Sequence, residues 1–185
     1  MATTALSRNP ESTDLLQSTK FRITFNYLPG MTFFCQSVNF PGVSLTEVVR
    51  NTPFVDLYVP GDKLVYDTLN FTFLVDEEMR AYTEIHDWMR GLTFPTEFEE
   101  YIDLVRKGQL IPRATGISSK DAAQYTDAVV TIYSNKNNPK FRIKFVDVFP
   151  TVLSPIIFNA QDTAENVVVA DATFRFSYYN FEKIS

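Results

Sequence analysis

The sequence predicts a mainly β fold of the α+β class, an antiparallel sandwich or barrel-like domain with a flanking helical insert. Several segments alternate apolar and polar residues, which is typical of strands with one buried face. Pro-Gly pairs at 29–30, 41–42 and 60–61 indicate turns between such strands. Between about 77 and 107 the apolar residues recur at steps of three and four, which indicates helices.

The composition fits one globular domain and excludes several classes of protein. The chain has 185 residues, of which 45% are hydrophobic and 15% aromatic, and Phe accounts for 17 of them. Its 22 acidic and 17 basic residues leave a net charge of −5, which argues against a broad basic face for nucleic acid. No apolar run reaches the roughly 18 residues of a membrane-spanning helix. With a single cysteine and no secretory signal, we expect synthesis in a reducing cytoplasm.

The first half of the chain is expected to start with an arm and continue as strands. Residues 1–20 are polar and predict a flexible N-terminal arm ahead of a single domain over 21–185. Residues 21–27 alternate as a strand, and after Pro29-Gly30 the segment 32–38 is expected to return beside it. Further on, the expected elements are two short strands split by Asn51-Thr52-Pro53 and one cleanly alternating strand: 45–49, 54–58 and 69–75.

Two helices are expected next. Asp76 is suited to cap the first, with Glu77 and Glu78 near the positive end of its dipole. Thr96-x-x-Glu99 has the spacing of a capping box and opens the second, while Gly108 suits its left-handed C-terminal position.

The last third of the chain returns to β structure. The strand over 141–149 loses its alternation near Asp147, which predicts a bulge. Pro150 and Pro155 are expected to frame a connection. The remaining expected elements are a loop, a strand, a turn, a polar loop tip and a long strand: 109–124, 128–133, 135–139, 161–166 and 167–181.

No catalytic, cofactor or metal site is predicted. Cys35 lies in an apolar strand and is expected to be an inert core thiol, because a nucleophile would need a neighbouring base. His86 is the only histidine, and Glu84 two residues away faces another side of a helix, so no metal ligand set forms. The acidic runs fit solvated helix starts better than a catalytic carboxylate pair. We therefore expect a protein that is not an enzyme.

A basic stretch follows the turn near residue 137. Its four cations alternate with apolar residues, and they fit a solvated strand face or an acidic partner as well as nucleic acid: Lys136, Lys140, Arg142 and Lys144. The net acidity of the chain weighs against specific nucleic-acid binding. The surplus of apolar and aromatic residues in the strands favours assembly with other chains.

Three segments resemble the tail tube proteins of contractile-tail bacteriophages. One is the strand-to-helix stretch 69–78, LNFTFLVDEE, followed by Tyr82, Ile85, Asp87 and Trp88. Another is similar to the closing hairpin of that family: Phe141, Asp147, Phe149-Pro150, Ser154 and the Phe174-Phe176-Tyr178 strand. The third is similar to its early strand and corner: Phe33-Phe34-Cys35-Gln36 and Phe40-Pro41-Gly42.

This resemblance implies a tail-tube fold and a structural role in the virion tail. Family members form hexameric rings whose sheets join into an inner barrel, and the rings stack into a tube that DNA passes through. Implied partners are further copies of the chain, tail sheath, baseplate hub and tail terminator proteins, with assembly in the bacterial host cytoplasm. The alternatives are a baseplate tube-initiator ring and, in another class, a monomeric β-rich ligand-binding domain.

Two hypotheses concern how such a tube would work. An acidic lumen would let DNA slide, because the phosphate backbone binds tightly where cations neutralise it. The N-terminal arm 1–20 and the segment 43–68 are the expected contacts to a neighbouring ring, ordering on assembly.

Overall fold

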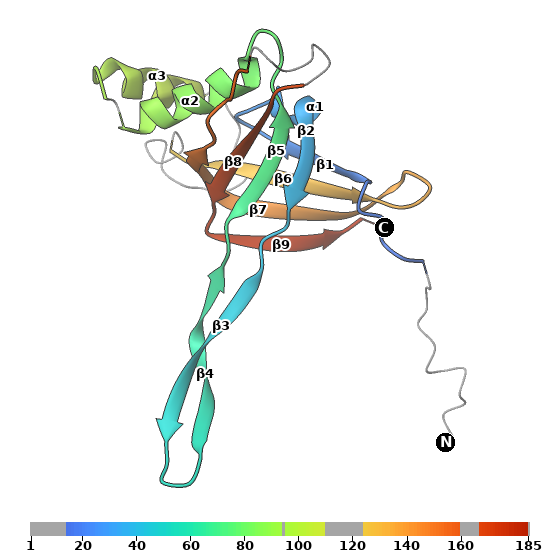
Figure 1. Ribbon diagram of the computed structural model, residues 1–185, viewed down its shortest axis with the longest axis vertical. Helices are drawn as coiled ribbons and strands as arrows, with labels where there is room; N and C mark the ends of the chain where they lie inside the picture. The colour runs from blue at the N-terminus through green and yellow to red at the C-terminus, as the bar shows by residue number, and fades with distance from the viewer. Residues whose placement is uncertain (1–13, 94, 110–123, 160–166, 185) are drawn as a thin grey trace.

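Two antiparallel sheets packed face to face form the body of the protein (Figure 1). The computed structural model describes residues 14–93, 95–109, 124–159 and 167–184. Six of its strands follow one hydrogen-bonded path, β1-β6-β7-β8-β5-β2, and a seventh, β9, pairs with β7. A two-stranded hairpin of β3 (Val43–Asn51) and β4 (Asp56–Tyr66) projects from one end of this body (Figure 1). Two helices, α2 (Arg80–Thr93) and α3 (Glu99–Gln109), lie at another end. The expected mainly β, sandwich-like fold is confirmed.

The first sheet contains β1, β6, β9 and the first half of β7. Its strands are Phe21–Phe25, Thr126–Tyr133, Tyr178–Lys183 and Pro139–Leu153. The register aligns Ile23 with Val130 and Val130 with Ile143, and all three side chains are buried. Because side chains alternate along each strand, the intervening residues face away from the core.

β7 passes from the first sheet into the second at a bulge. Asp147 has φ 57°, and the pairing with β6 shifts between Phe145 and Val148. This confirms the bulge predicted near Asp147. The connection predicted at Pro150 is wrong: β7 continues to Leu153, and Pro150 pairs with Phe174 of β8. The register shifts again directly after Pro150, which is where a strand tolerates proline.

The second sheet contains the other half of β7 with β8, β5 and β2. These strands are Val169–Arg175, Leu69–Leu74 and Cys35–Asn39. The prediction of one long strand over 167–181 is wrong. The chain turns at Ser177, whose backbone N–H donates to the Val146 carbonyl at 2.9 Å, and β9 then joins the first sheet. Phe174 is fully buried, whereas Tyr178 is 42% exposed.

The segment 32–38 does not return beside the first strand. A short helix, α1 (Met31–Phe34), follows Gly30 and buries Met31, and β2 then pairs with β5 rather than β1. The alternation of residues predicted an extended segment but not the strand it pairs with. Strand pairing depends on how the whole core packs, which a local pattern does not contain.

Helix α2 (Arg80–Thr93) begins four residues after Asp76, so the predicted cap is wrong. Asp76 instead opens a turn: its carbonyl accepts a hydrogen bond from Met79 N–H at 2.9 Å, and Met79 has φ 52°. Helix α3 (Glu99–Gln109) runs through Gly108, so the predicted helix end there is also wrong. The expected loops 109–124 and 161–166 fall almost entirely outside the described residues.

Aromatic rings link the two sheets and α2 in one core. The Phe25 ring of the first sheet lies 5.4 Å from both Phe71 and Phe174 of the second. The ring centroid of Trp88 in α2 lies 5.0 Å from that of Tyr27 and 6.1 Å from that of Phe174. The helix therefore covers one end of the sandwich instead of standing apart from it.

Candidate assembly surface

The β3–β4 hairpin carries a dense set of exposed apolar side chains. It comprises Val43–Asn51 and Asp56–Tyr66, which pair antiparallel and project away from the sandwich (Figure 1). Their exposed fractions lie between 43% and 97%: Val43, Leu45, Val48, Val49, Phe54, Val55, Leu57, Tyr58, Val59, Leu64 and Val65. Large contiguous apolar surfaces of this kind mark sites of protein association.

Both faces of the hairpin are apolar. Val48 pairs with Val59, and the next pair along, Val49 with Tyr58, points to the opposite face. Such a ribbon cannot bury its apolar residues by lying flat on its own sandwich, because one face would stay in water. Both faces of the hairpin therefore expose apolar side chains.

A tight bulge shapes the hairpin at Thr46 and Gly61. The register shifts between Leu45 and Glu47, and Thr46 Oγ1 donates to the Lys63 carbonyl at 3.2 Å. A Cβ at Gly61 would lie 2.5 Å from Thr46 Oγ1 and 2.6 Å from the Thr46 carbonyl oxygen. Only glycine allows this close approach, so the Pro60-Gly61 pair marks a bulge inside β4 and not the turn expected from the sequence.

The root of the hairpin is held by aromatic contacts and one closing hydrogen bond. The Asp67 N–H donates to the Gly42 carbonyl at 3.0 Å. Phe40 lies 5.1 Å from Tyr179, and Tyr66 lies 5.3 Å from the same ring. The exposed ribbon is thereby fixed in direction relative to the C-terminal strand β9.

Cys35 packs against the edge of the core but is not fully buried, whereas the sequence predicted a core thiol. It is half-buried at the start of β2, and Sγ donates weakly to the Ser37 carbonyl at 3.6 Å. Burial raises the pKa of this thiol to about 11. The side chain is therefore protonated at neutral pH and is a poor nucleophile.

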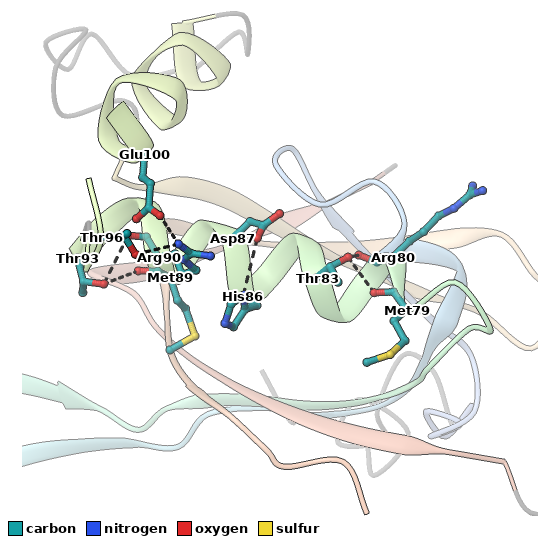
Figure 2. A network of polar contacts seen from close by, with 10 residues as sticks. All are labelled: Met79, Arg80, Thr83, His86, Asp87, Met89, Arg90, Thr93, Thr96 and Glu100. Carbon is teal, nitrogen blue, oxygen red and sulfur yellow. Dashed lines mark hydrogen bonds and ion pairs between the residues drawn. The ribbon is translucent and has the colours of Figure 1, made fainter. Parts of the chain in front are cut away.

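The helical polar groups form structural contacts (Figure 2). His86 lies on the exposed surface of α2 with Nδ1 3.7 Å from an Asp87 carboxylate oxygen. Arg90 joins the two helices, pairing with Glu100 of α3 and donating to Thr96 Oγ1 at 3.3 Å. Within the described residues, no group of three or more His, Cys, Asp or Glu side chains is placed to hold a metal ion.

A cleft of about 560 Å³ lies between the helices and the segment before α1. Tyr27, Trp88, Glu84, Asp87 and Asp103 are among the residues that line it.

The predicted basic residues lie on and beside the first sheet. Arg142 and Lys144 share its solvent face with Arg22, because Arg22 and Arg142 both align with Thr131 of β6. Lys144 Nζ lies 3.4 Å from a Glu182 carboxylate oxygen on β9. Sequence reasoning missed Arg22 and Glu182, since only the strand order brings them beside Arg142.

No helix among the described residues has the length and apolar character needed to cross a membrane.

The sandwich, the flanking helix pair and the projecting hairpin form a fold that is also found in chains of contractile injection systems. The fold matches the tube-terminating cap of the anti-feeding prophage with a TM-score of 0.59, at 11% identity, over 98% of this chain and all of that one. It also matches a chain of the PVC sheath–tube complex in the extended state with a TM-score of 0.57, at 12% identity, over 99% of this chain and all of that one.

The phage tail tube protein family is matched over residues 17–182, and the chain belongs to this family. A relative from Enterobacteria phage T4, the tail tube terminator protein, is 25% identical over 166 residues, which is 85% of this chain and 82% of that protein. The protein is a structural component of a phage tail.

Proposed function

We propose that the chain assembles into hexameric rings that stack into the inner tail tube through which phage DNA passes. Membership of the tail tube family supports this role, as does the match to tube and cap proteins across nearly the whole chain. Its partners would be further copies of itself, the tail sheath, the baseplate hub and the tail terminator, meeting in the host cytoplasm.

The exposed hairpin is the observation that carries the proposal. Its eleven exposed apolar residues lie on both faces of a two-stranded ribbon that projects away from the core. Removing them from water would favour association by about 25 cal/mol for each Å² of apolar surface buried. In the proposed stack of rings, this ribbon would lie between neighbouring subunits.

The charge of the chain fits a conduit for DNA. At −5 each, six copies would carry −30 in one ring, which disfavours neutralisation of phosphates by the wall. The proposal requires the acidic residues, and not Lys136, Lys140, Arg142 and Lys144, to dominate the lumen.

A second candidate function is a ring that ends the tube. The T4 relative carries the name of a tube terminator, and the matched anti-feeding prophage chain is a terminating cap. A terminator would form one ring and stop, whereas a tube subunit or a baseplate initiator would support further stacking.

Serine substitutions on the hairpin test the proposal. Val48→Ser with Leu57→Ser removes two exposed apolar side chains from one face, and the matched control Val152→Ser with Ile157→Ser removes two outside the hairpin. We expect negative-stain electron microscopy to show stacked rings for the control and unstacked rings for the hairpin variant. Stacks of equal length in both would contradict a stacking role for the hairpin.

The N-terminal arm is expected to contribute to the same contact. Residues 1–13 lie outside the described part, and Leu15 and Leu16 beyond them are exposed. Deleting residues 1–20 should impair stacking and leave the far-UV circular dichroism of the domain intact. Unchanged polymerisation would count against this role.

A further inference from the structure

The chain separates its charges into an acidic lobe and a basic face. Residues 76–109, which include α2 and α3 and are called here the acidic lobe, hold nine acidic and four basic residues, a net charge of −5. The rest of the chain has thirteen of each sign and is neutral. The whole net charge of the protein is therefore carried by the helical lobe.

The basic face lies on the solvent side of the first sheet. Four cations make up this face: Arg22, Lys140, Arg142 and Lys144. Their positions share one face because residues two apart along a strand point the same way, and Ile143 between them is buried. Three carboxylates lie on or beside this face: Glu182 of β9, 3.4 Å from Lys144, Asp127 of β6, and Asp14, which borders a hollow with Lys140. The four cations leave a small excess of positive charge over them.

The two charged regions lie toward opposite ends of β7. The basic row occupies its first half, beside the β6–β7 turn, while its last residues lead to Ser154, whose carbonyl accepts a hydrogen bond from Tyr82 of α2 at 3.2 Å. The eleven steps from Arg142 to Leu153 span up to about 37 Å at 3.4 Å per residue. Figure 1 shows the helices and the β6–β7 turn on opposite sides of the molecule.

We propose that the acidic lobe of one copy contacts the basic face of the next copy, so that copies associate head to tail. Two different, complementary patches on one chain generate a heterologous contact, which produces rings or stacks and not a closed symmetric pair. This rests on the proposed function and adds the surfaces that join its subunits. Complementary charge also orients the encounter, because like faces repel one another.

The acidic lobe offers exposed carboxylates for this contact. Glu97 and Glu99 are exposed at the start of α3, whereas Glu100 beside them is engaged with Arg90 of α2. The contact between Glu100 and Arg90 holds α3 against α2, and it leaves the neighbouring acidic groups in solvent.

Reciprocal charge reversal tests this directly. Variant one, Arg142→Glu with Lys144→Glu, makes both regions acidic. Variant two, Glu97→Lys with Glu99→Lys, lowers the net charge of the lobe from −5 to −1 and makes the exposed start of α3 basic. We expect each variant alone to lose an assembly that the wild-type protein forms, and an equimolar mixture to regain it as alternating copies. Sedimentation velocity and negative-stain microscopy measure both results, and misfolded variants could not rescue each other.

The controls separate this inference from the proposed function. Arg175→Glu with Lys183→Glu makes the same charge change off the basic face and should assemble normally. If Glu99→Lys lowers the melting temperature, Glu77→Lys replaces it.

Suppose that the wild-type protein forms rings and both variants are folded. The inference alone is then overturned if each variant assembles by itself, or if the two fail to assemble when mixed. Loss of binding to duplex DNA in variant one with assembly intact would overturn it in favour of a nucleic-acid face. A wild-type protein that forms no assembly at all would overturn the inference and the proposed function together.

Discussion

Trp88 joins the helical part of the protein to the sandwich. It is the single tryptophan of the chain, it is 1% exposed, and its ring contacts Tyr27 and Phe174. The helix pattern of the sequence identified the apolar stripe to which Trp88 belongs. The aromatic partners could not be inferred, because they come from segments more than sixty residues apart in both directions.

We expect Trp88→Ala to destabilise the protein by about 3–5 kcal/mol, the range for removing a large aromatic side chain from a core. Denaturant unfolding followed by circular dichroism measures the change. Trp88→Phe fills most of the space and should lose much less. Equal stability of the alanine variant and wild type would contradict the placement of Trp88 in the core.

Cys35 offers a test of burial through its reactivity. With a pKa of about 11, about a thousandth of the thiol is ionised at pH 8, so alkylation should run roughly two orders of magnitude slower than for a free thiol of pKa near 8.5. The rate should rise with pH towards 11. The native state holds this proton more tightly than the unfolded chain. The free energy of unfolding should therefore fall as the pH rises from about 8.5 to about 11. Alkylation as fast as that of free cysteine would contradict the burial.

At the scale of elements, alternation and helical spacing predicted those strands and helices that have one buried face. The strand 69–75 and the helical region were predicted because the buried residues of each lie on one face. The ends were wrong where a local turn competed, as at Asp76, which opens a turn with Met79 and leaves α2 to begin at Arg80. The candidate surface 43–68 was found in outline, but its form as one long hairpin depends on the Thr46–Gly61 bulge.

We expect Gly61→Val to distort the hairpin, since a Cβ there would collide with the Thr46 backbone and hydroxyl. The variant should keep the sandwich and lose ring stacking, which hydrogen exchange and negative-stain microscopy would show. Gly30→Ala is the matched control, because its Cβ would meet only Glu84 Oε2 at 3.6 Å, an ordinary contact. Loss of stacking in the control as well would contradict a specific effect of the bulge.

The contact between the helices also depends on a glycine. A Cβ at Gly91 would lie 3.0 Å from the Leu104 Cβ, so α2 and α3 approach closely at this point. We expect Gly91→Val to push α3 away from α2 and to lower the melting temperature by several degrees, as measured by thermal unfolding. An unchanged melting temperature would show that α3 does not depend on this contact.

At the scale of the whole molecule, the sequence predicted the fold class but not the connectivity of the sheets. β2 pairs with β5, and β7 serves both sheets, because the shared core between Phe25 and Phe174 decides which strands meet. The abundance of aromatic residues now has two explanations. Many of them fill this core, and others, such as Phe54 and Tyr58, lie exposed on the hairpin, where the proposed assembly would cover them.

Assembly is the central claim, and electron microscopy of the purified full-length protein tests it most directly. Negative-stain images over a range of concentrations should show sixfold rings with a central channel, stacking end to end as concentration rises. Single rings that never stack would favour the terminator role. Monomers at every concentration, with the fold intact by circular dichroism, would contradict the account.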